Sequence, residues 1–176
     1  MYRRQLEHVI LEVGRRNDLE YFYIISSAAL LAVLPDPPKG ALTATRDVDI
    51  IPPFDDDRLA DRLSWVLGEG SDFDIEHGYY VQGVSWTTPL YAPKDWHLRA
   101  LPVRVDRYTG LCMEPHDLTL SKLSAGCEKD LEFVQDVARL GLIQRATLLE
   151  RLTAVETTPE HRELLKQRIG ALFSDT

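Results

Sequence analysis

Apolar residues recur along the first part of the chain at intervals typical of helices and of buried strands. Near the N-terminus they follow one helix face, which predicts an amphipathic helix over residues 2 to 17. Residues 21 to 25 are aromatic and β-branched, which favours a buried strand. Three aspartates at 55 to 57 then offer N-caps for a helix that carries Leu59 and Leu63 on one face.

Between residues 73 and 113 the runs are shorter and the pattern favours strands. The expected elements are a β-hairpin over 73–76 and 79–84, an extended stretch over 85–91, and strands over 102–106 and 111–113. From residue 118 the helical spacing returns, with breaks at 125–126 and at Gly141. Two last helices are expected over 146–155 and 159–173.

This order of elements predicts an α+β fold with a mixed sheet flanked by helices and a C-terminal helical bundle. A chain of 176 residues, 44% of them hydrophobic, is long enough for a real core and within the length of one domain. We therefore expect a core of residues 1–113 and a helical subdomain of residues 114–176 packed on it as one compact unit.

The charge and the cysteines limit the function further. A formal net charge of −8 argues against a surface that binds nucleic acid everywhere, although a local basic patch stays open. Cys112 and Cys127 are not spaced as metal ligands and are expected to be reduced thiols. The polar N-terminus and the absence of a long apolar run predict a cytoplasmic protein without a membrane partner.

Two acidic residues stand inside an apolar run and need an explanation. In a strand, Asp47 and Asp49 would share one face while Val48 and Ile50 point to the core. Neighbouring carboxylates repel each other unless a cation neutralises them. Mg²⁺ is commonly held by one or two carboxylates together with substrate phosphates. The alternative is a pair of solvated acids at a strand end, because such pairs are common by chance.

A turn of small hydroxyl residues precedes this pair. Ser26 and Ser27 connect the strand at 21–25 to an expected helix start. Hydroxyl groups and free backbone N–H groups at a helix N-terminus attract anions such as phosphate. We expect the strand that carries Asp47 and Asp49 to be central in the sheet, with the serine turn beside its acidic end.

A second polar segment begins the helical region. Residues 117 to 130 read D-L-T-L-S-K-L-S-A-G-C-E-K-D. Lys122 lies between leucines, and a buried lysine needs an anionic partner, which a triphosphate or the acid pair would supply. A lysine that extends from an amphipathic helix into water would need none. Asp130 either orients Lys122 or complements a helix N-terminus.

Together these segments resemble the minimal nucleotidyltransferases of the DNA polymerase β superfamily, and more closely their AbiEii-like and MenT-like branch from toxin–antitoxin systems. The resemblance covers about residues 20 to 143. Ser26 and Cys127 stand where that branch has glycine and arginine. The matching segments are Ser26 to Ala29, Pro35 to Pro38, Asp47 to Pro52, Gly78 to Val84, Asp117 to Asp130 and, more loosely, Pro93 to Leu101.

The resemblance implies an Mg²⁺- or Mn²⁺-dependent nucleotidyltransferase that moves a nucleoside monophosphate from an NTP to an acceptor hydroxyl or phosphate. The acceptor would be RNA such as tRNA, a protein hydroxyl or a small molecule, and a cognate antitoxin would be a partner. The implied catalytic residues are Asp47, Asp49, Lys122 and Asp130, with the metal on Asp47 and Asp49 and the nucleotide at Ser26, Ser27 and Lys129. A third acid would come from a later strand, and the candidates are Asp74, Glu76 and Asp106.

Two other functions fit the same residues. One is a catalytically degenerate protein with the nucleotidyltransferase fold, which would bind a nucleotide or a protein partner. The other is a metal-dependent phosphohydrolase that uses the same carboxylates. The sequence leaves open which NTP, which acceptor and which oligomeric state apply.

Overall fold

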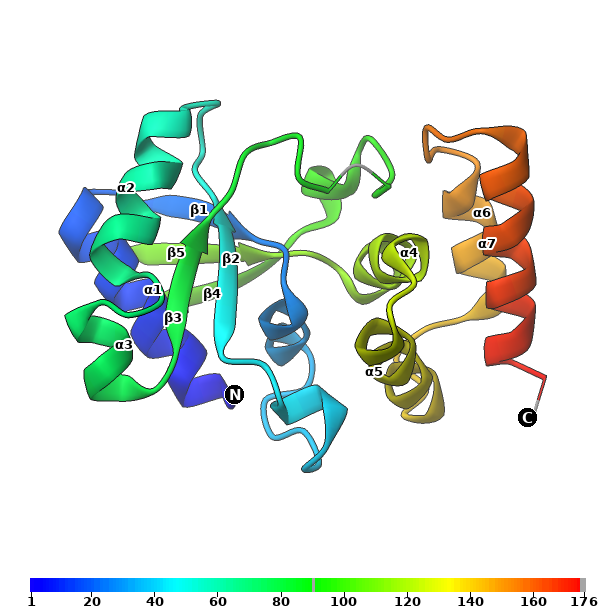
Figure 1. Cartoon of the computed structure of the whole chain (residues 1–176), viewed down its shortest axis with the longest axis horizontal. Coiled ribbons are helices and arrows are strands. Elements are labelled where there is room, and N and C mark those ends of the chain that lie inside the picture. Colours follow the sequence, from blue (N-terminus) through cyan, green and yellow to red (C-terminus); the bar gives the residue numbers. More distant parts are fainter. Residues whose placement is uncertain (90, 175–176) are drawn as a thin grey trace. The chain divides into compact units, whose positions relative to one another are not determined.

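The computed structural model describes residues 1–89 and 91–174 (Figure 1). Its contacts divide the chain into two compact units. The sheet unit consists of Met1–Thr88 and Ala100–Met113, and the helical unit consists of Pro89–Arg99 and Glu114–Thr176. Residues 89–99 therefore belong with the helices, although the division expected from the sequence placed them in the core.

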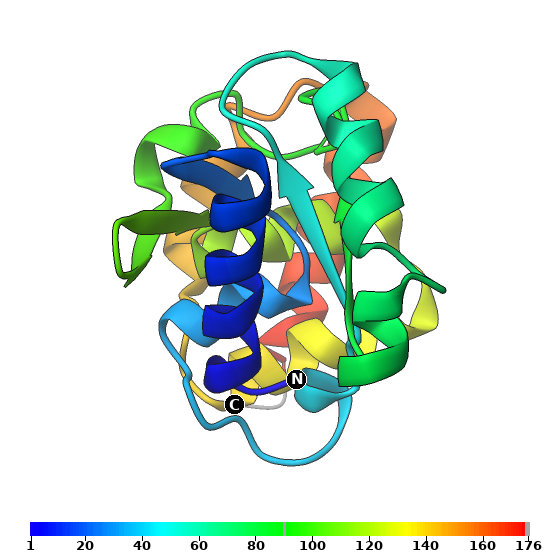
Figure 2. The same ribbon diagram turned by 90° about the vertical axis from the view of Figure 1, so that its left-hand side faces the viewer.

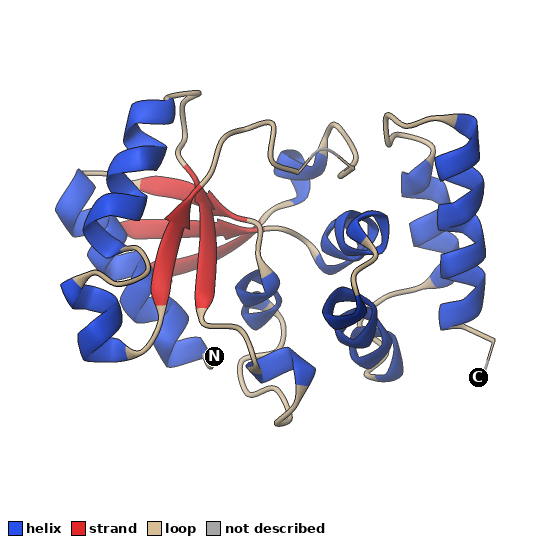
Figure 3. Ribbon diagram, in the orientation of Figure 1, coloured by secondary structure: helices blue, strands red, loops and turns tan. Residues whose placement is uncertain are grey.

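The sheet unit contains a five-stranded mixed sheet in the order β3-β2-β1-β5-β4 (Figures 1 and 3). β1 pairs antiparallel with β2 and parallel with β5, β2 pairs parallel with β3, and β4 pairs antiparallel with β5. The predicted α+β class with a mixed sheet is thus correct. The strands are β1 (Tyr21–Ile24), β2 (Asp47–Ile51), β3 (Tyr80–Gly83), β4 (Leu101–Val105) and β5 (Tyr108–Cys112).

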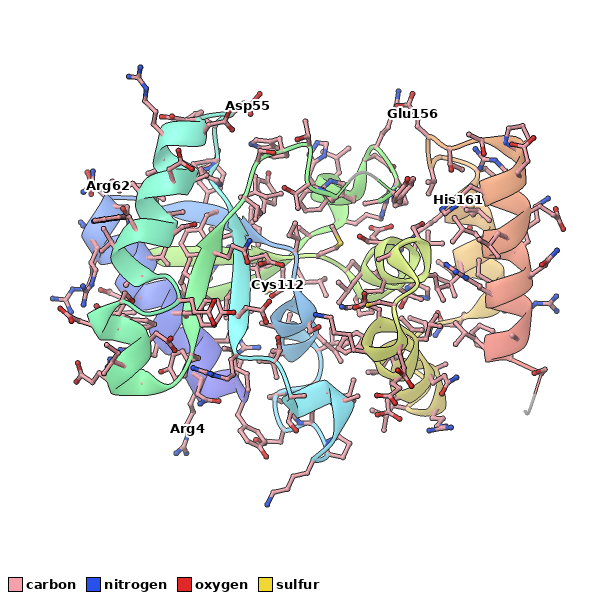
Figure 4. All side chains as sticks on the ribbon, viewed as in Figure 1. Arg4, Asp55, Arg62, Cys112, Glu156 and His161 are labelled. Carbon is pink, nitrogen blue, oxygen red and sulfur yellow. The ribbon has the colours of Figure 1, made fainter. Side chains whose placement is uncertain are left out.

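One face of this sheet is buried beneath helices α1 (Arg3–Asn17) and α2 (Asp57–Leu67), which lie on the same side of it (Figure 2). Two glycines allow the helices to approach closely, since a Cβ on Gly110 would meet Ile10 and one on Gly83 would meet the backbone of Ala60. Arg4 on α1 and Arg62 on α2 point away from the sheet (Figure 4). The strand residues without exposed area on the buried face are Phe22, Ile24, Val48, Ile50, Val81 and Cys112.

The helix predictions near the N-terminus are confirmed, but the predicted hairpin is wrong. Residues 72–77 form helix α3 (Asp72–His77) instead of a strand. The Ser71 hydroxyl caps it by accepting from the Asp74 N–H, and Gly78 ends it in the left-handed conformation, with φ of 75°. These end signals outweigh the short alternating run at 73–76. β3 therefore pairs with β2 and not with the segment before it.

The extended stretch expected after β3 is also not a strand. Residues 85–89 and 91 form turns and irregular structure, and Leu90 lies outside the described residues. A 3₁₀ helix, η3 (Trp96–Arg99), follows in the helical unit.

Among its described residues, the helical unit also contains four α-helices, and the breaks between them lie where the sequence predicts them. Gly126 ends the first in the left-handed conformation, with φ of 66°, and the Thr158 hydroxyl caps the last. None of the described helices has the length and apolar character needed to cross a membrane. The helices are α4 (Pro115–Ala125), α5 (Glu128–Arg139), α6 (Arg145–Leu152) and α7 (Pro159–Leu172).

A buried ion pair holds η3 to the rest of this unit. The Arg99 guanidinium donates to both carboxylate oxygens of Asp117, over 2.9 and 3.1 Å. Asp117 has no exposed side-chain area, and Arg151 also donates to it and to Glu114. Because Asp117 is fully buried, its charge needs the two arginine partners, and the contact with Arg99 fixes where η3 packs.

The close packing of β3 against α2 gives a first prediction. In Gly83→Ala the new Cβ would stand 1.9 Å from the Ala60 carbonyl oxygen, so the two elements must separate. We expect a loss of about 1–3 kcal/mol in the free energy of unfolding, measured in urea. Gly170→Ala is the control, because no atom lies within 4 Å of its Cβ position on α7. It should raise stability by about 0.5–1 kcal/mol, and equal effects of the two changes would contradict this packing.

Candidate active site

The serine turn joins β1 to a short 3₁₀ helix, η1 (Ser27–Ala32), so a helix starts where the sequence predicts one. The buried Ser26 hydroxyl caps this helix by accepting from the Ala28 N–H over 3.4 Å. The backbone of Ser26 has φ of −82° and ψ of −179°, which is extended and open to any residue. Serine therefore takes the place of glycine here without backbone strain.

The serine turn lies beside the two acids, as expected. The N–H of Ile25, the residue before the turn, donates to the Asp49 carbonyl over 3.1 Å. β2 lies between β3 and β1, so the strand that carries the acids is an inner strand. The turn and the acid pair consequently meet at the same end of two neighbouring strands.

Asp47 and Asp49 share one face of β2, opposite the buried Val48 and Ile50. Both acids are half-buried. The Thr45 hydroxyl donates to the Asp47 carboxylate over 2.6 Å. The two carboxylates thus share the sheet face opposite to α1 and α2.

Two residues that the sequence reasoning missed stand beside them. Tyr80 and Gln82 on β3 are in register with Asp47 and Asp49, and partners in a parallel pair point to the same face. Burial, and after it the negative charge of Asp47, raises the pKa of Tyr80. Gln82 is exposed and offers a neutral amide oxygen next to Asp49. Only the pairing of β2 with β3 identifies these neighbours, and the sequence had predicted another partner for β3.

None of the three candidates for a third acid lies on a later strand. Asp74 is on α3, where it accepts from the Gly70 N–H over 3.1 Å and pairs with Arg46 over 2.8 Å. Glu76 is exposed on the same helix, and Asp106 lies in the β4–β5 turn with φ of 54°. The later strands place only non-acidic residues on the face of Asp47. These are Tyr80, Gln82, Pro102, Arg104, Thr109 and Leu111.

The donor set is therefore a pair of carboxylates with neutral oxygen groups beside it. Within residues 1–89 and 91–174, no group of three or more His, Cys, Asp or Glu side chains could hold a metal ion. Two carboxylates nevertheless fit Mg²⁺, which takes hard oxygen ligands and completes its shell with phosphates and water. The residues present thus fit a metal that arrives with a nucleotide better than one bound by the protein alone.

The second group of predicted residues lies in the helical unit. Lys122 on α4 donates to Asp130 on α5 over 2.6 Å, and the side chains are only 15% and 12% exposed. The Cys127 thiol donates to the other carboxylate oxygen over 2.7 Å, and the Lys122 amine lies 4.8 Å from the centre of the Phe133 ring. Asp130 is therefore an anionic partner of the half-buried lysine within its own unit.

The environment of Asp130 keeps it ionised. Burial opposes the charged form, but the hydrogen bonds from Cys127 and Lys122 outweigh it, so the pKa of Asp130 lies below its ordinary value. Lys129, by contrast, is exposed in the first turn of α5. Both cysteines are free thiols, and burial raises the pKa of Cys112 to about 12. Cys112 lies at the end of β5 (Figure 4).

The Lys122–Asp130 pair gives a second prediction. Lys122→Ala leaves a buried carboxylate with one donor fewer, so it should lower the free energy of unfolding by about 2–4 kcal/mol near neutral pH. Lys166→Ala is the matched control, because Lys166 and Glu163 form an ion pair whose side chains are 51% and 60% exposed. Its effect should stay within about 0.5 kcal/mol.

The difference in the free energy of unfolding between the parent and Lys122→Ala should become smaller in acid. In the parent, the folded pKa of Asp130 is depressed, so its stabilising effect is present above the ordinary value of 3.8 and is lost as the pH falls through the folded pKa. In the variant, protonation of Asp130 relieves the uncompensated charge. Urea unfolding at about pH 7 and about pH 3.5 tests both statements, and a difference that grows in acid would contradict this account of the pair.

Comparison with known proteins identifies the family of the chain. A family model described as a nucleotidyltransferase of unknown function (DUF6036) matches residues 4–168. No curated protein and no solved structure matches the chain significantly. The family match includes the serine turn, the acid pair and the Lys122–Asp130 pair. Because it extends over nearly the whole chain, this protein belongs to the DUF6036 family of nucleotidyltransferases.

Proposed function

We propose that the protein is a divalent-metal-dependent nucleotidyltransferase that holds the metal with Asp47 and Asp49. One observation carries the proposal: two half-buried carboxylates share one face of an inner strand, next to the serine turn. An acid pair on its own would be weak evidence. Its position beside the turn, in a chain of a nucleotidyltransferase family, favours nucleotidyl transfer over phosphate hydrolysis.

The proposed reaction transfers a nucleoside monophosphate. The acceptor oxygen forms a bond to the α-phosphorus of the NTP, the bond from that phosphorus to the β-phosphate oxygen breaks, and pyrophosphate leaves. The proton of the acceptor hydroxyl is released to water. When bound, Mg²⁺ or Mn²⁺ would polarise the phosphate oxygens and stabilise the charge that develops on them.

The remaining predicted residues receive roles from the family resemblance. Ser27 follows the capping Ser26 and is half-exposed, so its hydroxyl is the one that we assign to the phosphates. Lys122 has three donor hydrogens and directs one to Asp130, so its amine can serve a phosphate while it keeps its carboxylate partner. Asp130 then acts as a positioning residue for Lys122, and Lys129 contributes an exposed positive charge.

The acceptor and the biological setting are a further part of the proposal. The resemblance to the AbiEii-like and MenT-like branch supports a role in a toxin–antitoxin system, with tRNA, another RNA or a protein as acceptor and a cognate antitoxin as partner. A net charge of −8 gives no general attraction for a polyanion, so an RNA acceptor would depend on a local basic surface.

A second candidate function is a degenerate protein that keeps the fold and binds a nucleotide or a partner. The observation in its favour is that Gln82 and Tyr80 stand where β3 could have supplied an acid. Serine in place of glycine at position 26 does not support a degenerate protein, because a φ of −82° is open to any residue. Metal binding by the acid pair separates the two candidates.

The third prediction concerns this metal binding. Mn²⁺ together with an NTP should raise the unfolding temperature more than either alone, because a ligand that binds only the native state stabilises it by mass action. Asp47→Asn and Asp49→Asn should each abolish the Mn²⁺ effect. The control is Asp61→Asn on α2, an exposed acid outside the site, which should retain it. Thermal unfolding with each of the four NTPs gives the measurement.

The stability of the metal-free Asp47→Asn variant tests the same proposal independently. Asparagine keeps an oxygen that can accept from Thr45, and it removes the repulsion between the two carboxylates. We therefore expect the free energy of unfolding in urea to be unchanged or slightly higher. A loss of about 1–3 kcal/mol, the usual cost of unsatisfied buried groups, would indicate a structural acid. Such a loss, combined with no Mn²⁺ effect in the parent, would refute the enzyme assignment.

A further inference from the structure

Thr45 places a hydroxyl group beside the first of the two acids. This hydroxyl donates to the Oδ1 atom of Asp47 over 2.6 Å, a length typical of a hydroxyl bonded to a charged oxygen. Such bonds are roughly twice as strong as those between neutral groups. Both side chains are half-buried, so salt screens the contact less than it would at an exposed surface. The contact is therefore able to fix the orientation of this carboxylate.

The residue between these two groups is anchored to β3 and α3. The Arg46 carbonyl accepts from the Tyr80 N–H over 2.9 Å, as part of the pairing between β2 and β3. The Arg46 guanidinium donates to the Gly78 carbonyl over 2.9 Å and to the Asp74 carboxylate over 2.8 Å. The backbone that carries both the hydroxyl and the carboxylate is thus held by its neighbours in the sheet unit.

The bond from Thr45 occupies only one of the two carboxylate oxygens. Within residues 1–89 and 91–174, the Asp47 side chain accepts a hydrogen bond from Thr45 alone, and no donor reaches its Oδ2 atom. One oxygen is therefore held in place, and the other is left for a ligand. Mg²⁺ requires near-ideal octahedral geometry, so the direction in which the second oxygen points decides how well it serves such an ion.

We propose that Thr45 is a positioning residue for Asp47 as a metal ligand: its hydroxyl holds one carboxylate oxygen and thereby directs the other to the metal. The inference rests on the proposed function, which takes the metal to bind at Asp47 and Asp49. Groups that hydrogen-bond to a metal ligand orient it, and their loss typically weakens metal binding by about 10- to 100-fold.

Two other roles of the hydroxyl predict different results. A donor that only reduces the negative charge on Asp47 would weaken its attraction for a cation, so removal of the donor would tighten metal binding. A hydroxyl that only stabilises the loop before β2 would change the free energy of unfolding and leave metal binding as it is. A positioning role predicts weaker metal binding by the folded protein, which neither alternative does.

The test measures the binding of Mn²⁺ and an NTP to the whole chain. ATP, GTP, CTP and UTP are each titrated by isothermal calorimetry with Mn²⁺ present, and the nucleotide that the parent binds most tightly is used for the variants. Thr45→Val keeps the shape of threonine without its hydroxyl, and it should raise the Kd by about 10- to 100-fold. Thr45→Ser keeps the hydroxyl and should bind as the parent does.

Two features of the measurement separate positioning from damage to the fold. Calorimetry gives the stoichiometry separately from the Kd, so a smaller folded fraction does not resemble a weaker site. The same titration with EDTA in place of Mn²⁺ gives the affinity for the nucleotide without metal, which Thr45→Val should leave unchanged. If Thr45→Val does not fold, Thr45→Ala replaces it, because alanine removes the hydroxyl without adding a methyl group in its place.

Thr43→Val is the matched control, because Thr43 lies two residues earlier in the same loop and its hydroxyl bonds to backbone. This hydroxyl donates to the Gly40 carbonyl and accepts from the Gly40 N–H, each over 3.1 Å. The loss of these bonds should lower the midpoint of unfolding in urea. It should leave the Kd for Mn²⁺ and the nucleotide unchanged, because the Thr43 hydroxyl does not contact a carboxylate.

Each other outcome decides against a stated part. If Thr45→Val binds as tightly as the parent or more tightly, the positioning role is overturned and the proposed function stands. Equal losses in Thr45→Val and Thr45→Ser would also overturn it, and so would an equal loss in Thr43→Val or in the titration with EDTA, because the contact of the hydroxyl with Asp47 would then not be the cause. If the parent binds no NTP with Mn²⁺, the proposed function fails and this inference fails with it.

Discussion

The alternation along β2 is the constraint on which the proposed site depends. Val48 and Ile50 have no exposed area on the face beneath the helices, so Asp47 and Asp49 must stand on the other face. A slip of one residue in the pairing with β1 or β3 would move both carboxylates into the apolar core at a large desolvation cost. The packing of the core therefore fixes the position of the acids and of their neighbours on β3.

The helical unit depends on a different kind of constraint. Its buried charges each have a defined partner: Asp117 with Arg99 and Arg151, and Asp130 with Lys122. A buried charge without its partner is costly, so these pairs determine how α4, α5 and the segment 89–99 pack. Asp130 accepts one hydrogen bond from the Lys122 amine, which leaves two donor hydrogens for the phosphate role that we propose for Lys122.

Local signals in the sequence explain which parts of the fold were predictable. α1 and α7 have a regular apolar face and end signals, and both were found close to their observed limits. The D-x-D strand was also found, because its alternation is short but regular. α3 was missed because only Phe73 and Ile75 suggested a strand, whereas the caps at Ser71 and Gly78 decide its structure. In so short a segment, the alternation of apolar residues is weaker evidence than the capping residues at the two ends.

The candidate site was predictable only as far as its residues lie on single elements. Asp47 and Asp49 are neighbours within one strand, and Lys122 and Asp130 lie in one continuous segment of the sequence, residues 117–130. The partners Gln82 and Tyr80 depend on the pairing of β3 with β2, and Arg99 depends on a contact with Asp117 eighteen residues away. Contacts of this kind come from tertiary packing, so no local period in the sequence reports them.

The composition of the acid face suggests why a bound nucleotide would matter to the metal. With two carboxylates and a neutral amide in register, the protein supplies less negative charge than a site with three acids would. Like-charge repulsion in the metal-free protein is correspondingly smaller, and so is the intrinsic attraction for a divalent cation. The phosphates of the nucleotide would then supply the missing charge. Metal and nucleotide would therefore bind as a unit.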